Sequence, residues 1–119
     1  MKIAVTSKGK HLDSQVDPRF GRAAYILIVD TDSFDFEVVD NSENVNALKG
    51  AGIQTASMVS DKGAEVLLTG LCGPNAFKTL EVAGVKVAND VSGTVRDAVT
   101  VFNEGKSLFV DGANVEGQW

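Results

Sequence analysis

Two arginines stand three positions apart, with an aromatic ring between them, in the run DPRFGR over residues 17–22. Arginine donates several hydrogen bonds in a fixed planar geometry, and glycine lets a ligand approach the backbone closely. Arg19, Phe20, Gly21 and Arg22 are therefore candidate residues for binding a large anion. In the alternative interpretation the arginines pair with Asp13, Asp17 or Asp30 on a solvated surface, as many surface arginines do.

The polar stretch that contains this run, residues 7–22, carries further positive charge. Lys8, Lys10 and His11 would add to the field, and His11 is alternatively a metal ligand. Residues 1–22 hold five basic and two acidic residues, a net charge of +3, although the whole 119-residue chain has a net charge of −5. The overall acidity argues against nucleic acid as a partner, because phosphate neutralisation needs a basic surface. The positive charge of residues 1–22, in an otherwise acidic chain, predicts a compact anionic ligand.

A second group of candidates lies in the turn GLCGPNA over residues 70–76. The pattern predicts a glycine-rich junction between a strand and a helix, where free N–H groups and the helix dipole favour an anion. Cys72, Gly73 and Asn75 are the candidates here. The same field would lower the pKa of Cys72 and make it a thiolate. The alternative is that Cys72 is a buried, inert, small apolar residue.

A third group follows another short apolar run. Ser92, Gly93 and Thr94 combine hydroxyl groups and a glycine just before a predicted helix, so they are candidate donors to an anion. In the alternative they only cap that helix, which is the commoner use of such residues.

Cys72 is the only cysteine in the chain. It cannot form an internal disulfide, and by itself it cannot build a zinc or iron–sulfur site. We therefore expect a reducing, cytoplasmic location, with no signal peptide and no membrane partner, since no apolar stretch approaches eighteen residues. A thiol-dependent redox or sensory role for Cys72 stays open as an alternative, although it would need a thiol from outside the chain.

These candidates must be positioned by strands and helices. Apolar runs and turn signals predict strands over residues 2–6, 24–30, 34–40, 65–69 and 85–88, with a further short one over 108–110. Helices are predicted over residues 53–62, 74–83 and 94–104, each followed by a glycine suited to a left-handed C-terminal cap. Thr94 and Asp97 resemble a capping box.

The alternation of helix and strand predicts an α/β fold, with parallel strands buried under helices and an early antiparallel hairpin that makes the sheet mixed. Length and composition predict one domain over residues 1–119, of which about 111–119 form a weakly ordered tail. In such sheets ligands bind beyond the carboxyl ends of the parallel strands. The three candidate groups all follow predicted strands, so we expect them to meet there.

The chain resembles the dinitrogenase iron–molybdenum cofactor biosynthesis family over essentially its whole length. The resemblance rests on the opening strand, DPRFGRA over residues 17–23, GIQTA over 52–56 and GLCGPNA over 70–76. It implies a ribonuclease-H-like fold, with a central mixed five-stranded sheet whose first three strands are antiparallel and whose faces carry helices. It further implies non-covalent binding or carriage of a ligand. We expect a monomer that is not an enzyme and that exchanges this ligand with a protein donor or recipient.

That ligand is implied to be a molybdenum-containing metal–sulfur cluster or its precursor: a molybdenum–copper sulfide cluster, or another molybdenum or iron–sulfur species. Such a cluster is a polarisable anion that brings its own sulfide, so cationic side chains, backbone N–H groups and an apolar wall would hold it. Arg19, Arg22, Gly73 and Phe20 would supply these, and Cys72 is a candidate metal ligand.

A metal-dependent nuclease is a competing interpretation of the same fold. It needs clustered carboxylates, one of them usually within the first strand. The predicted strand over residues 2–6 has none, and Asp30, Asp40 and Asp90 lie at the ends of predicted strands.

Overall fold

The computed structural model describes residues 1–42, 51–107 and 109–110. The strands and helices follow one another as β1 (Lys2–Ser7), β2 (Tyr25–Asp30), β3 (Phe36–Asp40), α2 (Ala51–Asp61), β4 (Val66–Leu68), α3 (Pro74–Val82), β5 (Lys86–Ala88), α4 (Val95–Asn103) and β6 (Phe109–Val110). Every element predicted from the sequence is confirmed, with ends that differ by at most two residues. The tail expected over residues 111–119 lies outside the described residues.

The strands form one mixed sheet in the order β3-β2-β1-β4-β5-β6. β1 and β3 pair with β2 in antiparallel fashion, which confirms the prediction for the first three strands. β4 pairs in parallel with β1 and with β5. The expectation of five strands was one short, because β6 adds an antiparallel edge, with Ala88 opposite Phe109. β6 has only two residues. Such a short strand shows no sequence pattern from which its pairing in the sheet could be predicted.

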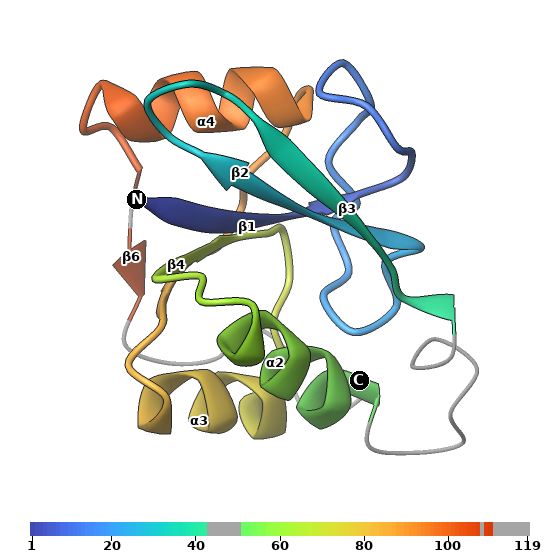
Figure 1. Cartoon of the computed structure of the whole chain (residues 1–119). Helices are drawn as coiled ribbons and strands as arrows, with labels where there is room; N and C mark the ends of the chain where they lie inside the picture. The colour runs from blue at the N-terminus through green and yellow to red at the C-terminus, as the bar shows by residue number, and fades with distance from the viewer. Residues whose placement is uncertain (43–50, 108, 111–119) are drawn as a thin grey trace.

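Helices cover both faces of the sheet. α4 lies over one face, and α2 and α3 lie over the other, as Figure 1 shows. Each face has its own buried cluster: Ala56, Val59 and Leu80 pack on the α2 and α3 side, and Val95 and Val99 pack on the α4 side. Because both faces are covered, the central strands are continuously apolar rather than alternating. Among the described residues no helix has the length and apolar character that crossing a membrane requires.

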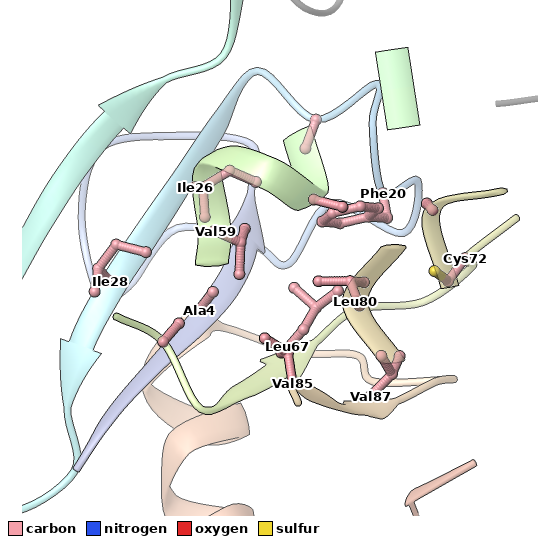
Figure 2. Close-up of a cluster of buried hydrophobic side chains, with 14 residues drawn as sticks. Ala4, Phe20, Ile26, Ile28, Val59, Leu67, Cys72, Leu80, Val85 and Val87 are labelled. Atoms are coloured by element: carbon pink, nitrogen blue, oxygen red, sulfur yellow. The ribbon is translucent and has the colours of Figure 1, made fainter. Parts of the chain in front are cut away.

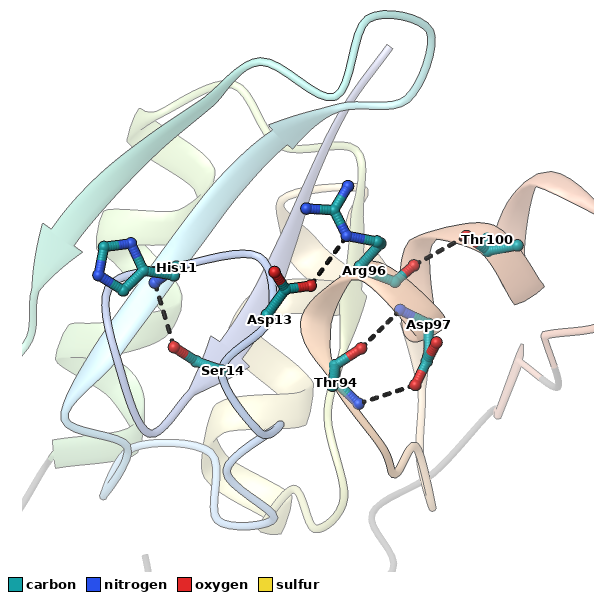
Figure 3. A network of polar contacts seen from close by, with 7 residues as sticks. All are labelled: His11, Asp13, Ser14, Thr94, Arg96, Asp97 and Thr100. Carbon is teal, nitrogen blue, oxygen red and sulfur yellow. Dashed lines mark hydrogen bonds and ion pairs between the residues drawn. The ribbon is translucent and has the colours of Figure 1, made fainter.

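The capping box at the start of α4 is confirmed (Figure 3). The Asp97 N–H donates to Thr94 Oγ1 at 3.0 Å, and the Thr94 N–H donates to Asp97 Oδ2 at 3.3 Å. These bonds satisfy two N–H groups that would otherwise lack a partner in the first turn. The first turn of α4 is thereby fixed beside the loop that follows β1.

Candidate functional site

Three loops meet at the carboxyl ends of β1, β4 and β5, as the strand pattern predicted. The loop after β1 pairs with the loop after β4, since the Phe20 N–H donates to the Leu71 carbonyl oxygen at 3.0 Å. It also pairs with the loop after β5, where the Val16 N–H donates to the Gly93 carbonyl oxygen at 2.9 Å. Backbone hydrogen bonds therefore hold all three candidate groups at one end of the sheet.

Two threonines anchor this arrangement from inside the sheet. Thr6 in β1 donates from Oγ1 to the Asp17 carbonyl oxygen at 2.6 Å, and its Oγ1 lies 3.0 Å from Oγ1 of Thr69. Both threonines are fully buried. Neither threonine was among the predicted site residues. Their signal is a hydroxyl at the end of an otherwise apolar strand, where a buried hydroxyl needs a hydrogen-bond partner.

Asp17 orients Arg19. The Asp17 carboxylate is buried, accepts the Arg19 N–H at 3.0 Å, and lies 3.7 Å from Arg19 Nε. The Arg19 side chain is nevertheless 53% exposed. The alternative of a carboxylate pair is thus confirmed for Arg19, but this single contact leaves a large part of the guanidinium facing solvent, where it can bind an anion.

A tight turn brings the two arginines together. The Arg22 N–H donates to the Arg19 carbonyl oxygen at 3.2 Å, and Gly21 between them has a φ of 89°. A side chain disfavours this left-handed conformation, so glycine is the suitable residue at position 21. Arg22 itself is half-buried. The turn therefore places two arginines in one short segment.

Phe20, expected to form an apolar wall for the ligand, is fully buried instead. Its ring belongs to the core cluster on the α2 and α3 face, beside Leu80 and Cys72 (Figure 2). That expectation was wrong, because a phenyl ring gains more from burial in the core than from partial exposure at a loop surface. The buried Phe20 ring anchors the loop to the core. Arg19 and Arg22 precede and follow it in the sequence.

Lys8 and His11 lie on the outer part of the same loop, and both side chains are exposed. The loop is tied to α4 by an ion pair between Arg96 Nε and Asp13 Oδ1, which lie 3.0 Å apart (Figure 3). Asp13 and Asp17, the two acidic residues among the first 22, thus each have an arginine partner. Arg96 thus offsets the charge of Asp13 from outside the loop, whereas Asp17 offsets the charge of Arg19 within it.

Of the two interpretations of Cys72, the structure supports the buried, inert thiol rather than the activated thiolate. It is fully buried, and this burial raises its pKa to about 12. The cause is desolvation of the charged form, although the neighbouring Gly73 is the N-cap residue of α3. The thiol lies 3.7 Å from the Gly73 carbonyl oxygen and packs in the core rather than at the loop surface.

The raised pKa predicts slow alkylation of Cys72. At pH 8 a thiol with a pKa near 12 is ionised in about one molecule in 10⁴, whereas an unfolded cysteine is about one-quarter ionised. Iodoacetamide should therefore label native protein about 1,000-fold more slowly than protein in urea, and the native rate should rise about tenfold per pH unit. Mass spectrometry measures both rates, with Cys72→Ala as the control. Equal rates would contradict the burial described here.

The third candidate group divides between structural roles and an open surface. Thr94 is engaged in the capping box, and the Gly93 carbonyl oxygen accepts from Val16, so the capping alternative is confirmed for Thr94. Ser92 is exposed and lines a cavity together with Asn89. Asn75 in the first turn of α3 is also exposed. Asn89 was not among the predicted site residues.

No group of three or more histidine, cysteine, aspartate or glutamate residues within the described parts of the chain is placed to hold a metal ion. Asp30 and Asp40 act in turns. The Asp30 carboxyl accepts hydrogen bonds from the backbone N–H groups of Asp32 and Ser33, which lower its pKa. The backbone N–H of Ser42 lowers the pKa of the Asp40 carboxyl in the same way. The described carboxylates therefore do not form the cluster that a two-metal nuclease needs.

Comparison with known proteins identifies the family. The family model described as "Dinitrogenase iron-molybdenum cofactor" matches residues 1–105. The chain belongs to this family. This member is similar in structure to the apo form of the orange protein from Desulfovibrio gigas, with 46% identity, 96% of each chain covered and a TM-score of 0.93.

Two further relatives extend the comparison. The NMR structure of the Thermotoga protein TM1290, of the DUF35 family, is 40% identical to this family member over 98% of each chain, with a TM-score of 0.82. The uncharacterised protein MJ0580 from Methanocaldococcus jannaschii is 26% identical over 109 residues, which are 89% of this chain and 88% of that protein. Family membership supports metal-cluster or cofactor-related binding.

Proposed function

We propose that the protein binds and carries, without a covalent link, a molybdenum-containing metal–sulfur cluster or its precursor. A molybdenum–copper sulfide is the favoured cluster. The observation that carries the proposal is the position of the Arg19–Arg22 turn at the carboxyl end of the sheet. Hydrogen bonds between this segment and the loop after β4 hold the turn there. Its setting, in a chain 46% identical to the orange protein, supports the same conclusion.

The chemistry of such a cluster suits this turn. A thiometallate cluster is an anion whose metals already carry sulfide, so the protein need not provide a set of thiolates. Arginine guanidinium groups donate charge-assisted hydrogen bonds to such an anion. In this proposal Arg19 and Arg22 make the main contacts, and Lys8 and His11 add positive field from the outer loop.

The remaining candidates have secondary roles in the proposal. Gly73, Asn75, Ser92 and Gly93 border the site from the two neighbouring loops. Cys72 is not required as a ligand, because its thiol is buried and protonated at neutral pH. The same burial argues against a redox or sensory function that acts through this thiol.

A cluster held by charge and hydrogen bonds can leave without breaking a metal bond to the protein. This suits carriage between a protein donor and a recipient by a monomeric, cytoplasmic protein that catalyses no reaction. Assignment of the sheet to the ribonuclease-H-like folds belongs to the same proposal, and the first five strands in the order β3-β2-β1-β4-β5 support it.

Reconstitution tests the proposed function. We expect the purified protein, mixed with tetrathiomolybdate and copper and then desalted, to retain molybdenum, copper and a visible absorption band. Molybdate with copper is the matched control. It supplies an oxyanion without sulfide and should leave no coloured species on the protein. Absence of molybdenum by metal analysis, together with no visible absorbance after reconstitution, would overturn the proposal.

A further inference from the structure

The outer edge of β3 has room for a further strand. Among the described residues β3 is the last strand on its side of the sheet and pairs with β2 (Figure 1). Just after β3, the Asn41 N–H donates to the Ala24 carbonyl oxygen at 3.0 Å, and bonded pairs recur at every second residue of an antiparallel ladder. The N–H and C=O groups of Phe36, Val38 and Asp40 therefore face away from β2.

The side chains of β3 are only partly covered. Phe36 is 41% exposed, and Val38 and Val39 are half-buried. An exposed edge with apolar side chains is a template on which another chain can add a strand. β3 therefore offers both backbone groups and apolar surface to an added strand.

The hairpin that contains this edge is acidic. Residues 30–40 hold five carboxylates and no basic residue; the carboxylates are Asp30, Asp32, Asp35, Glu37 and Asp40. Lys2, Lys10 and Lys62 from other segments lie near the hairpin, and Lys62 Nζ is 2.6 Å from Glu37 Oε2. The carboxylates stay in excess. Like charges would oppose the pairing of two such edges from two copies of the chain, whereas a basic segment would be attracted.

A cavity of about 240 Å³ lies beside the start of β3. Its lining combines three carboxylates with one amine and two apolar side chains: Asp30, Asp35, Glu37, Lys2, Ile28 and Phe36. The aliphatic part of a lysine or arginine can pack on apolar groups while its charge stays among carboxylates. The cavity is therefore suited to a basic side chain from a strand added at this edge.

We propose that the free edge of β3 binds an extended, basic segment of a partner protein as a seventh strand of the sheet. Backbone hydrogen bonds would provide affinity, and basic side chains at alternate positions would provide specificity. A bound segment would reach the end of the sheet at which the candidate site lies, because Asp40 is opposite Tyr25 and Tyr25 is opposite Ser7. The proposal does not depend on the cluster-binding function.

Synthetic peptides test the partner chemistry on the full chain. We expect the end-blocked basic peptide GRVTVRVTG to shift the ¹H–¹⁵N resonances of residues 36–40 at physiological salt. Amide exchange of Phe36, Val38 and Asp40 should slow at least tenfold in the complex, whereas Glu37 and Val39, whose N–H groups face β2, should be unchanged. The acidic peptide GEVTVEVTG is the control and should bind at least tenfold more weakly.

Three outcomes would overturn the proposal. One is the absence of shifts over residues 36–40, or equal binding of the basic and acidic peptides. Another is binding of the basic peptide without slower exchange, which would show attraction by charge alone. The third is a dimer of the peptide-free protein in sedimentation, with the outward amides of β3 already protected, which would assign the edge to a second copy of the chain.

Two variants separate the backbone from the charge. Val38→Pro removes one outward N–H and no hydrogen bond to β2, and should weaken binding of the basic peptide at least tenfold. Asp35→Asn with Glu37→Gln keeps every backbone group and should also weaken it at least tenfold. Glu81→Gln with Asp90→Asn removes two exposed carboxylates on α3 and after β5, and should bind within twofold of wild type. Wild-type binding by the Asp35/Glu37 variant would overturn the assignment of a basic partner.

Discussion

Replacing Arg19 and Arg22 together by glutamine should lower retention of the molybdenum–sulfur cluster about 100-fold at physiological salt. Each guanidinium contributes charge-assisted hydrogen bonds, for which a loss of about 1.4 kcal/mol per residue corresponds to about tenfold in affinity. Glutamine keeps hydrogen-bond donors and a similar length, so the change isolates the charge. Metal content after gel filtration, together with titration of the visible band, measures retention.

Two lysines at the amino ends of their strands provide the matched control. Lys2 in β1 and Lys86 in β5 are exposed, and changing both to glutamine alters the net charge of the chain by the same amount. This control should retain the cluster within about twofold, because exposed charges beyond about 10 Å are largely screened at physiological salt. Equal retention by wild type and the Arg19/Arg22 variant would remove these arginines from the site.

The convergence of the three candidate loops could be predicted from the sequence because it depends on topology rather than on packing. Strand ends were recognisable from apolar runs bounded by turns, and the carboxyl ends of parallel strands meet at one edge of a sheet. The residues at this edge follow from chain order alone. For that reason the loop containing Arg19, the turn containing Cys72 and the loop containing Ser92 were correctly expected to meet.

The direction in which individual side chains point could not be predicted in the same way. The loop after β1 has no helical or strand period, so nothing local indicates that Phe20 faces the core while Arg19 faces solvent. For Cys72, the helix field and the cost of burial shift the pKa in opposite directions, and only the packing shows that burial wins. Phe20 and Cys72 both have neighbours that come from distant parts of the chain.

The residues missed from the sequence share this dependence on distant partners. Asn41 illustrates it: its Nδ2 donates to the Ala23 carbonyl oxygen at 2.9 Å, and Thr55 Oγ1 donates to its Oδ1 at 3.2 Å. As an isolated asparagine it is typical of a turn. In the fold it is buried and ties the end of the loop after β1 to α2.

Adding one methyl group at Gly70 should be the most damaging small change at the site. A Cβ at this position would lie 2.7 Å from both the Cα and the carbonyl oxygen of Pro18. These are backbone atoms, and the same segment is held by the hydrogen bond between the Phe20 N–H and the Leu71 carbonyl oxygen. The contact cannot relax by rotating a side chain, so the two loops must separate. Overpacking of this kind costs about 1–3 kcal/mol.

Gly70→Ala should therefore lower the free energy of unfolding by about 2 kcal/mol and weaken cluster retention at least tenfold, although every charge at the site remains. Gly84→Ala is the control: its φ of 79° makes alanine cost about 1 kcal/mol, but the added Cβ meets nothing within 4 Å. That variant should lose stability and keep the cluster. Urea unfolding and metal analysis measure the two effects separately. If Gly70→Ala keeps wild-type retention, the close contact between the loops does not position Arg19 and Arg22, and the site depends on charge alone.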